Sequence, residues 1–105
     1  MAKFIGFIPA RMGSKRVPNK NLRLYKKKPL IFYSIKASKN SKYIGETVDF
    51  SDSKKINIEA KKFGATTSYK RPIKVSKNIT SMFDTIDYFV KKNNIKNNFD
   101  YLVLL

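Results

Sequence analysis

The sequence predicts an α/β domain built on a doubly wound, mostly parallel sheet with helices on both faces. Short apolar runs rich in β-branched and aromatic residues alternate with segments whose apolar residues recur at helical spacing. The residues between successive apolar runs are numerous enough to form crossover helices. Because right-handed crossovers place helices on both sides of a parallel sheet, the alternation predicts a Rossmann-like layer.

The first strand and the first helix lie on either side of a basic loop. KFIGFIP, residues Lys3–Pro9, is an apolar run that ends in proline and is typical of a buried strand. The first helix is expected over Leu30–Lys39, because Ile31, Ile35 and Ser38 recur on one face at helical spacing.

The second strand and helix follow directly. Tyr43–Phe50 is rich in β-branched and aromatic residues, which favours a strand. The SDS stretch at 51–53 offers N-cap side chains for a helix, and Gly64 stands where a C′ glycine would end it. The apolar stripe of this helix is formed by Ile56, Ala60 and Phe63.

The last part of the chain predicts two strands around one helix. ATTSY, residues 65–69, is expected to be a short third strand, and YLVLL, residues 101–105, a fourth. A helix is expected from Ser81 onward. Its apolar stripe is formed by Met82, Phe83, Ile86, Phe89 and Val90.

The fourth strand is apolar throughout, which is typical of an interior strand covered on both faces. No helix or further strand follows it in the sequence, so an exposed apolar edge is expected. We therefore interpret residues 1–105 as a single, truncated part of a larger domain.

Composition excludes several kinds of chemistry. The 105 residues contain neither cysteine nor histidine, which excludes disulfides, thiolate or imidazole metal sites and catalysis by Ser-His-Asp or Cys-His groups. Any metal would be a hard cation such as Mg²⁺, held by carboxylates. No apolar run approaches the ~20 residues of a membrane span, and no convincing signal peptide is present, so the cytoplasm is the expected location.

The formal net charge of +16 has two interpretations. One is an electrostatic footprint for nucleic acid. The other is compositional drift toward lysine, which is favoured because 19 of the 23 basic residues are lysines scattered over every segment. We therefore do not expect nucleic acid as a partner, although a small basic nucleic-acid-binding protein remains an alternative.

The basic loop Ala10–Leu22 follows the first strand, at the edge of a parallel sheet where ligands bind. Gly13 permits close backbone approach, and Ser14 adds a hydroxyl donor. The charged and amide side chains of the loop are Arg11, Lys15, Arg16, Lys20 and Asn21. This mixture suits a polyphosphate, and a solvated basic turn is the alternative, because the loop is neither a Walker A motif nor a G-x-G-x-x-G motif.

IPARMGSK, followed by KN, resembles the signature of the sugar-activating cytidylyltransferases, above all the subgroup that joins CMP to sialic and related nonulosonic acids. KPLIFYSIKASKNS, VDFSDSKKI, FGATTSYKRP and YLVLL resemble later motifs of that family in order and spacing. A Kdo-type cytidylyltransferase is the nearest alternative. Its members carry S-T-R-x-P-G-K-P where this chain has SKRVPNKN, so Lys15 and the Lys20–Asn21 pair favour the nonulosonate branch.

The resemblance implies a transferase that uses CTP and Mg²⁺: a hydroxyl of the sugar acid attacks the α-phosphate, and pyrophosphate leaves. It also implies a cytoplasmic homodimer. The family's sugar-acid pocket, metal-binding aspartates and dimerisation arm correspond to sequence beyond Leu105, so the 105-residue chain alone is expected to be inactive.

The resemblance also assigns nucleotide-binding residues. Arg11 and Lys20 would neutralise the triphosphate and act in catalysis, while Arg71 matches an arginine that holds the base and Ser81 matches an assisting hydroxyl. A surface arginine and a plain helix-capping serine are the respective alternatives. Asp52 is interpreted as mainly structural. The full expected set is Ala10, Arg11, Gly13, Ser14, Lys15, Lys20, Asn21, Arg71 and Ser81.

Overall fold

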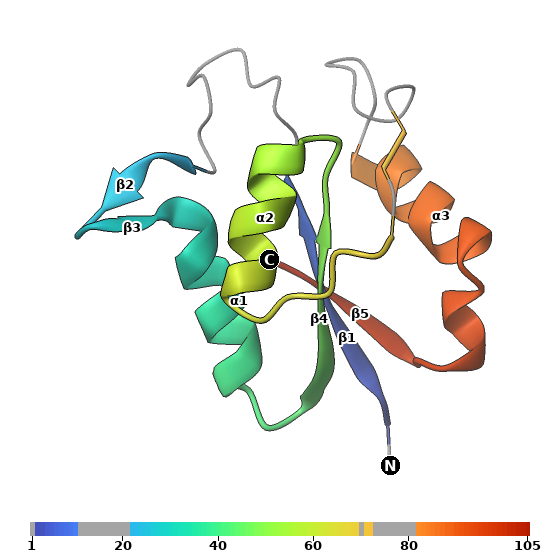
Figure 1. The fold of residues 1–105 in the computed structure, drawn as a ribbon. Coiled ribbons are helices and arrows are strands. Elements are labelled where there is room, and N and C mark those ends of the chain that lie inside the picture. Colours follow the sequence, from blue (N-terminus) through green and yellow to red (C-terminus); the bar gives the residue numbers. More distant parts are fainter. Residues whose placement is uncertain (1, 11–21, 70, 73–81) are drawn as a thin grey trace.

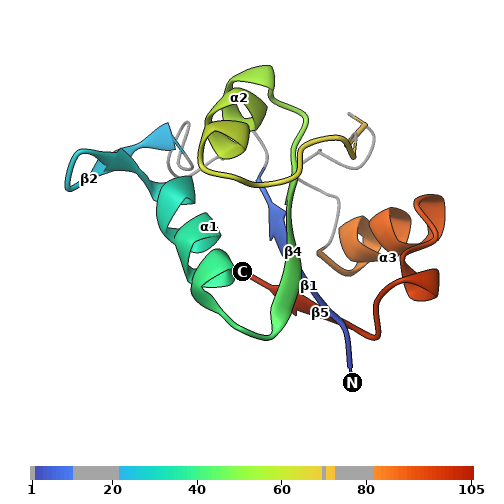
Figure 2. The same cartoon turned by 60° about the horizontal axis from the view of Figure 1, so that its bottom comes forward.

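A three-stranded parallel sheet in the order β4-β1-β5 organises the computed structural model, which describes residues 2–10, 22–69, 71–72 and 82–105. The strands are β1 (Phe4–Pro9), β4 (Ile44–Phe50) and β5 (Tyr101–Leu104). Helices α1 (Leu30–Asn40) and α2 (Lys54–Lys62) cover one face, and α3 (Met82–Lys92) covers the other (Figures 1 and 2). The predicted α/β class with helices on both faces is confirmed.

The central strand β1 pairs on both of its edges. It runs parallel to β4 up to the pair Pro9↔Phe50, and parallel to β5 from Phe4↔Tyr101 to Phe7↔Leu104. Because its side chains alternate between the two faces, β1 contributes to two separate cores. Ile5 and Phe7 face α3, and Ile8 and Ala10 face α1 and α2.

Each core layer is closed by helix residues. On the α3 face the Phe7 ring lies 4.6 Å from the Phe89 ring and 5.6 Å from the Phe50 ring, centroid to centroid. The opposite layer combines Ile8 with Ile31, Ile35 and Ile56.

Local signals predicted α1 and α2 closely. The predicted face of α1, Ile31, Ile35 and Ser38, is the buried face. Ser53 caps α2, its side chain accepting a hydrogen bond from the Ile56 amide at 3.3 Å. Gly64 follows the C-cap residue with φ +98°, a left-handed backbone conformation that only glycine adopts without strain.

The predicted third strand at 65–69 is wrong. Only Thr66 joins the sheet, through an isolated parallel bridge to Val48, with its amide donating to the Thr47 carbonyl at 2.8 Å. The chain then turns inward, and the Tyr69 ring packs on Phe89 at 5.2 Å. The contact between Tyr69 and the buried Phe89 takes the place of the backbone hydrogen bonds that a longer third strand would have made to β4.

The predicted buried stripe of α3 is only partly correct. Phe89 is buried and Ile86 and Val90 are partly buried, but Phe83 is 76% and Met82 46% exposed. Phe83 stands six residues before Phe89, which is roughly 120° around the helix axis, so both cannot face the sheet. Thr85, one turn before Phe89, occupies the buried position.

Two elements were not predicted. A small hairpin pairs β2 (Leu24–Tyr25) with β3 (Lys28–Pro29), and its turn residues Lys26 and Lys27 both have positive φ. A 3-10 helix, η3 (Ile95–Asn97), links α3 to β5. Both depend on local backbone conformations that their side chains do not signal. No helix in the described part of the chain is long and apolar enough to cross a membrane.

Strand β1 lies close against α1 at Gly6. A Cβ atom added there would collide with the Ser38 hydroxyl oxygen, which is buried and lies 2.6 Å from the Thr47 hydroxyl oxygen in a hydrogen bond. Glycine at this position therefore permits a polar contact between helix and sheet inside the core.

We predict that Gly6→Ala lowers the free energy of unfolding by about 1–3 kcal/mol, because the added methyl overpacks this contact. Gly45→Ala is the matched control, since a Cβ there would meet nothing nearer than the Phe4 carbonyl oxygen at 3.9 Å. Urea unfolding of both variants measures the difference. Equal stabilities would show that Gly6 is not required by the Ser38–Thr47 contact.

Candidate active site

The carboxyl ends of β1 and β4 meet at one edge of the sheet. Ala10, immediately after β1, is fully buried, and its amide donates to the Phe50 carbonyl at 3.2 Å. The turn from β4 to α2 begins at the same edge, where the Ser51 hydroxyl accepts from the Ser53 amide at 3.0 Å. The predicted basic loop therefore starts beside the N-terminal end of α2, a favourable environment for an anion.

Arg71 is buried rather than on the surface. Only 7% of the residue is exposed, and its guanidinium carbon lies 5.9 Å from the centroid of the Phe50 ring. Phe50 thus connects two predicted site residues: its carbonyl binds the Ala10 amide, and its ring supports Arg71. A buried guanidinium that lies over an aromatic ring at cation–π distance is restrained in its position.

The other predicted site residues lie outside the described part of the chain. These are Arg11, Gly13, Ser14, Lys15, Lys20, Asn21 and Ser81. Asp52, which the sequence analysis interpreted as structural, is exposed at the start of the turn into α2. The assignments of these residues stay predictions.

Asp49 is a buried carboxylate that the sequence analysis missed. It is fully buried, pairs in register with Ile8, and neither of its carboxylate oxygens has a hydrogen-bond partner in the structure as described. Strand alternation places it on the same face as Thr47, whose hydroxyl meets α1, and hence in the apolar layer of α1 and α2.

Desolvation in this layer raises the pKa of the Asp49 carboxyl from 3.8 to about 7. Its place one residue before the end of β4 puts this carboxyl next to the carboxyl edge of the sheet. The one signal in the sequence was the alternation of the polar residues Thr47, Asp49 and Ser51 with the apolar Val48 and Phe50, and the sequence analysis interpreted this stretch only as β-propensity.

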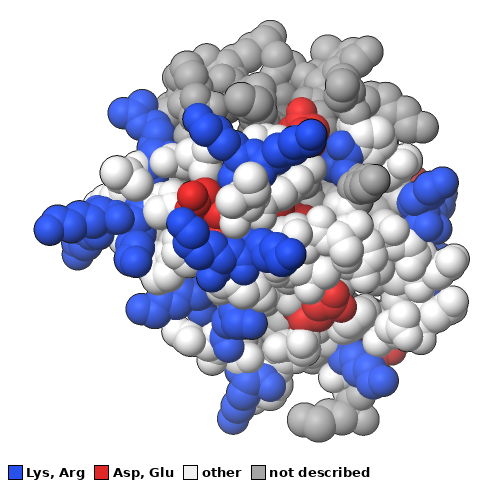
Figure 3. Space-filling model, viewed as in Figure 1, with Lys and Arg blue, Asp and Glu red and all other residues white. Residues whose placement is uncertain are grey.

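Positive charge is distributed unevenly between the two sides of the sheet. Residues 22–69 carry eleven Lys and Arg against four Asp and Glu, whereas residues 82–105 carry three against three. Lysines accordingly surround the side formed by α1, α2 and the β2–β3 hairpin (Figure 3). Lysines are scattered over the segments of the chain, as expected, and of these two described ranges 22–69 carries the larger net positive charge.

The described residues do not form a metal centre by themselves. No group of three or more acidic side chains gathers among them. The buried Asp49 therefore belongs to no cluster of three or more acidic side chains among the described residues, and we assign no step to a metal bound by this part of the chain.

The described residues form a parallel α/β sheet whose central strand ends at the carboxyl edge, next to the turn into α2, and this edge is where open α/β sheets bind their ligands. The family model described as "Cytidylyltransferase" matches residues 5–101, nearly the whole chain. This chain belongs to the cytidylyltransferase family.

Two relatives of this chain are named for reactions of legionaminic and pseudaminic acids. A CMP-N,N'-diacetyllegionaminic acid synthase of Legionella pneumophila is 36% identical over 104 residues, 98% of this chain and 45% of the relative. A pseudaminic acid cytidylyltransferase of Campylobacter jejuni is 42% identical over 79 residues, 75% of this chain and 34% of the relative. The chain thus spans less than half the length of these relatives.

A solved structure shares the fold. A CMP:2-keto-3-deoxy-manno-octonic acid synthetase complexed with CTP superimposes with a TM-score of 0.77 at 22% identity. The match covers 98% of this chain and 40% of that structure. At this identity the likeness establishes the fold alone, and it agrees with the α/β arrangement described above.

The raised pKa of Asp49 predicts an unusual dependence of stability on pH. The folded state holds the proton up to about pH 7, whereas the unfolded carboxyl loses it near 3.8. The stability linked to this proton is therefore fully present below about pH 4 and is lost as the pH rises to 7. The side chain of the Asp49→Asn variant stays neutral at every pH. Its free energy of unfolding, relative to that of the unmodified chain, should therefore rise by on the order of 2–4 kcal/mol from pH 5 to pH 8.

Urea unfolding at both pH values measures this gain. Asp87→Asn is the control, because Asp87 is a partly exposed partner of Lys91 at 3.3 Å and the substitution removes a surface ion pair. If Asp49→Asn and Asp87→Asn show the same change in stability between the two pH values, burial does not raise the pKa of the Asp49 carboxyl.

Proposed function

We propose that this chain carries the CTP-binding part of an enzyme that transfers CMP from CTP to a nonulosonic, sialic-acid-like sugar acid and releases pyrophosphate. The observation that carries the proposal is the start of the IPARMGSK motif at the carboxyl end of the central strand, with the buried Ala10 bonded to Phe50. Membership of the cytidylyltransferase family and the names of the two relatives support the same reaction.

The chemistry requires positioning and charge stabilisation. A hydroxyl oxygen of the sugar acid forms a bond to the α-phosphorus of CTP and loses its proton to solvent, the bond from that phosphorus to the bridging oxygen breaks, and pyrophosphate leaves with the electron pair. Arg11 and Lys20 are proposed to neutralise the triphosphate as this negative charge develops, and Arg71 to hold the cytosine side. No covalent intermediate with the protein is needed, so the absence of His and Cys from the sequence is no obstacle.

The remaining expectations accompany this proposal. Mg²⁺ would offset triphosphate charge, with ligands supplied by sequence other than the described residues. The whole enzyme is proposed to be a cytoplasmic homodimer.

A Kdo-type enzyme is the second candidate, since a 3-deoxy-manno-octulosonate cytidylyltransferase of Bdellovibrio bacteriovorus is 39% identical over 62 residues. Pyrophosphate release with a nonulosonic acid, but not with Kdo, would favour the first candidate.

The first test is nucleotide preference. We expect the chain to bind CTP more tightly than ATP in isothermal titration at moderate salt, because specific base contacts add to phosphate attraction. A nucleic-acid-binding protein would instead bind single-stranded DNA with an affinity that falls steeply with salt and would show no preference for CTP. That outcome would contradict the proposal.

In the whole enzyme, Lys20→Ala or Arg11→Ala should lower kcat/KM by a factor equivalent to about 2.7–4 kcal/mol, the cost of losing one stabilising donor. Lys92→Ala, which removes an equal charge from the exposed last turn of α3, should leave the rate of pyrophosphate release nearly unchanged. Near-normal rates in both loop variants would refute the assignment of the loop.

Arg71 offers a separate test, because Arg71→Lys keeps the charge but loses the planar group that stacks on Phe50. We expect the preference for CTP over ATP to fall by roughly tenfold, equivalent to about 1.4 kcal/mol. Melting temperatures of both proteins separate this effect from stability. A lower melting temperature with an unchanged nucleotide preference would show that Arg71 is structural.

A further inference from the structure

Asp49 is a buried carboxyl group to which the proposed reaction gives no role. None of the residue is exposed, and neither carboxylate oxygen has a hydrogen-bond partner in the structure as described. Buried polar groups in folded proteins are nearly always paired, so an unpaired carboxyl requires an explanation. An isolated ionised carboxylate is costly in an apolar layer, whereas the neutral acid is tolerated there.

The backbone holds the Asp49 side chain in this layer. On one edge of β4, Asp49 pairs in register with Ile8 of β1. On the other edge the Asp49 amide donates to the Thr66 carbonyl at 2.9 Å, and the Thr66 amide donates to the Thr47 carbonyl at 2.8 Å. Because the strand is paired on both edges here, the carboxyl cannot turn out to solvent without breaking sheet hydrogen bonds. Water therefore reaches it only if the helices that cover the layer move.

No charged group among the described residues offsets a negative charge on Asp49. Burial is the cause that raises its pKa to about 7, with no contribution from a neighbouring charge. The surfaces of α1, α2, β1 and the segment after α2 that form this layer contribute apolar side chains: Ile31, Ile35, Ile56, Ala60, Ile8, Ala10 and Ala65. An ionised carboxyl in this layer would have neither a hydrogen-bond donor nor a counter-charge from the described residues.

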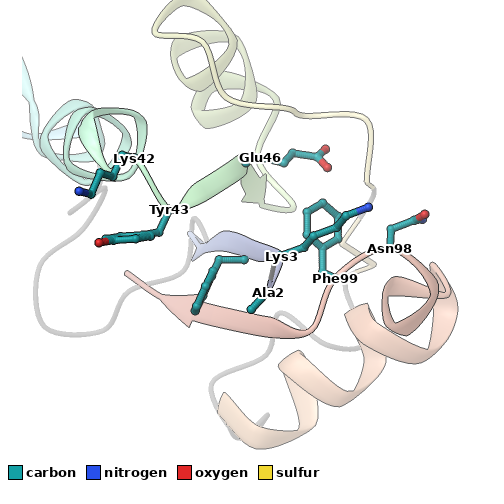
Figure 4. Close-up of a pocket in the computed structure, with 9 residues that line it drawn as sticks. Ala2, Lys3, Lys42, Tyr43, Glu46, Asn98 and Phe99 are labelled. Carbon is teal, nitrogen blue, oxygen red and sulfur yellow. The ribbon is translucent and has the colours of Figure 1, made fainter.

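The titratable side chains of the surrounding elements lie elsewhere. Those of α1 and α2 are exposed or partly exposed: Tyr33, Lys36, Lys39, Lys54, Lys55, Glu59, Lys61 and Lys62. Arg71 lies over Phe50, on the opposite face of β4. Glu46 stands three residues before Asp49 and hence also on the opposite face, and with Lys3 it borders an open hollow at the amino ends of the strands (Figure 4).

Helix α2 is the part of the cover that depends most on this packing. It has nine residues and buries only Ile56 and Ala60, whereas α1 has eleven residues and buries three. A helix shorter than about 12 residues is marginal in water by itself, so α2 stays folded only while it packs on the sheet. It follows the turn after β4, at the carboxyl edge. Loss of its packing would therefore alter the edge where the basic loop starts.

We propose that Asp49 is a pH-sensitive switch: the neutral acid lets α2 pack on the sheet, and ionisation of the carboxyl releases α2 and weakens nucleotide binding at the carboxyl edge. The first part, the release of α2, concerns the fold alone. The second part, the weaker binding, rests on the proposed function, because it assumes that CTP binds at this edge. Asp49 touches no substrate in this proposal and is a positioning residue.

Hydrogen exchange of the α2 amides, corrected for the intrinsic effect of pH, tests the first part. A group with a pKa of about 7 is roughly 9% ionised at pH 6 and roughly 91% ionised at pH 8. In the unmodified chain we therefore expect exchange in α2 to rise about tenfold between these pH values, and exchange in α3 to change less. Asp49→Asn, which cannot ionise, should keep α2 equally protected at both.

Asp49→Val is a second neutral variant, compatible with a strand, and it replaces Asp49→Asn if that variant fails to fold. Asp87→Asn is the control and should behave as the unmodified chain does, because Asp87 lies on α3, away from this layer. Equal protection of α2 at pH 6 and pH 8 in the unmodified chain would overturn the switch. An equal rise in exchange in a neutral variant would overturn it as well.

Isothermal titration with CTP at the same two pH values tests the second part. The terminal phosphate of CTP itself titrates near pH 6, so the readout is the affinity of the unmodified chain divided by that of Asp49→Asn. We expect this ratio to fall at least several-fold from pH 6 to pH 8. An unchanged ratio would refute the second part. If α2 is released as expected but neither protein binds CTP, the proposed function fails together with the second part, and the first part stands.

Discussion

The burial of β1 on both faces and along both edges is the constraint on which the rest of the structure depends. A strand in this position must supply two cores at once, and the alternation of Ile5 and Phe7 with Gly6 and Ile8 does so. Its hydrogen bonds go to β4 on one side and β5 on the other, which makes all three strands parallel. Parallel strands end at a common edge, and this places the loop after β1 beside the turn after β4.

The two cores differ in chemistry. The layer under α3 is aromatic, with Phe7, Phe50 and Phe89 in mutual contact. The layer under α1 and α2 is aliphatic but contains polar groups: the Ser38–Thr47 hydrogen bond and the carboxyl of Asp49. A satisfied hydroxyl pair is tolerated in such a layer, whereas a buried carboxyl is tolerated most easily as the neutral acid. The burial of the Asp49 carboxyl therefore lowers the stability of the fold at neutral pH, and this destabilising group lies next to the edge where ligands of this fold class bind.

The sheet presents different chemistry at its two ends. The carboxyl edge combines the N-terminal end of α2, the buried Arg71 and the start of the basic motif, and it suits a nucleotide. The amino end combines a bulge at Gly45 with two lysines and two aromatic rings. Since β1 spans six residues, roughly 20 Å separate these ends, too far for one small ligand to contact both.

The sequence by itself determined the elements whose signals are local. The strand at β1, the buried face of α1, the Ser53 cap and the Gly64 ending of α2 all depend on residues within a few positions of one another. The order and spacing of its motifs likewise indicated the cytidylyltransferase family. Only the tertiary structure decided that residues 65–69 make a single bridge and that α3 buries Thr85 and not Phe83. It also decided that Asp49 is buried in an apolar layer and that the Arg71 guanidinium lies over the Phe50 ring. Each of these depends on which distant segments pack together, and local propensity carries no information about such contacts.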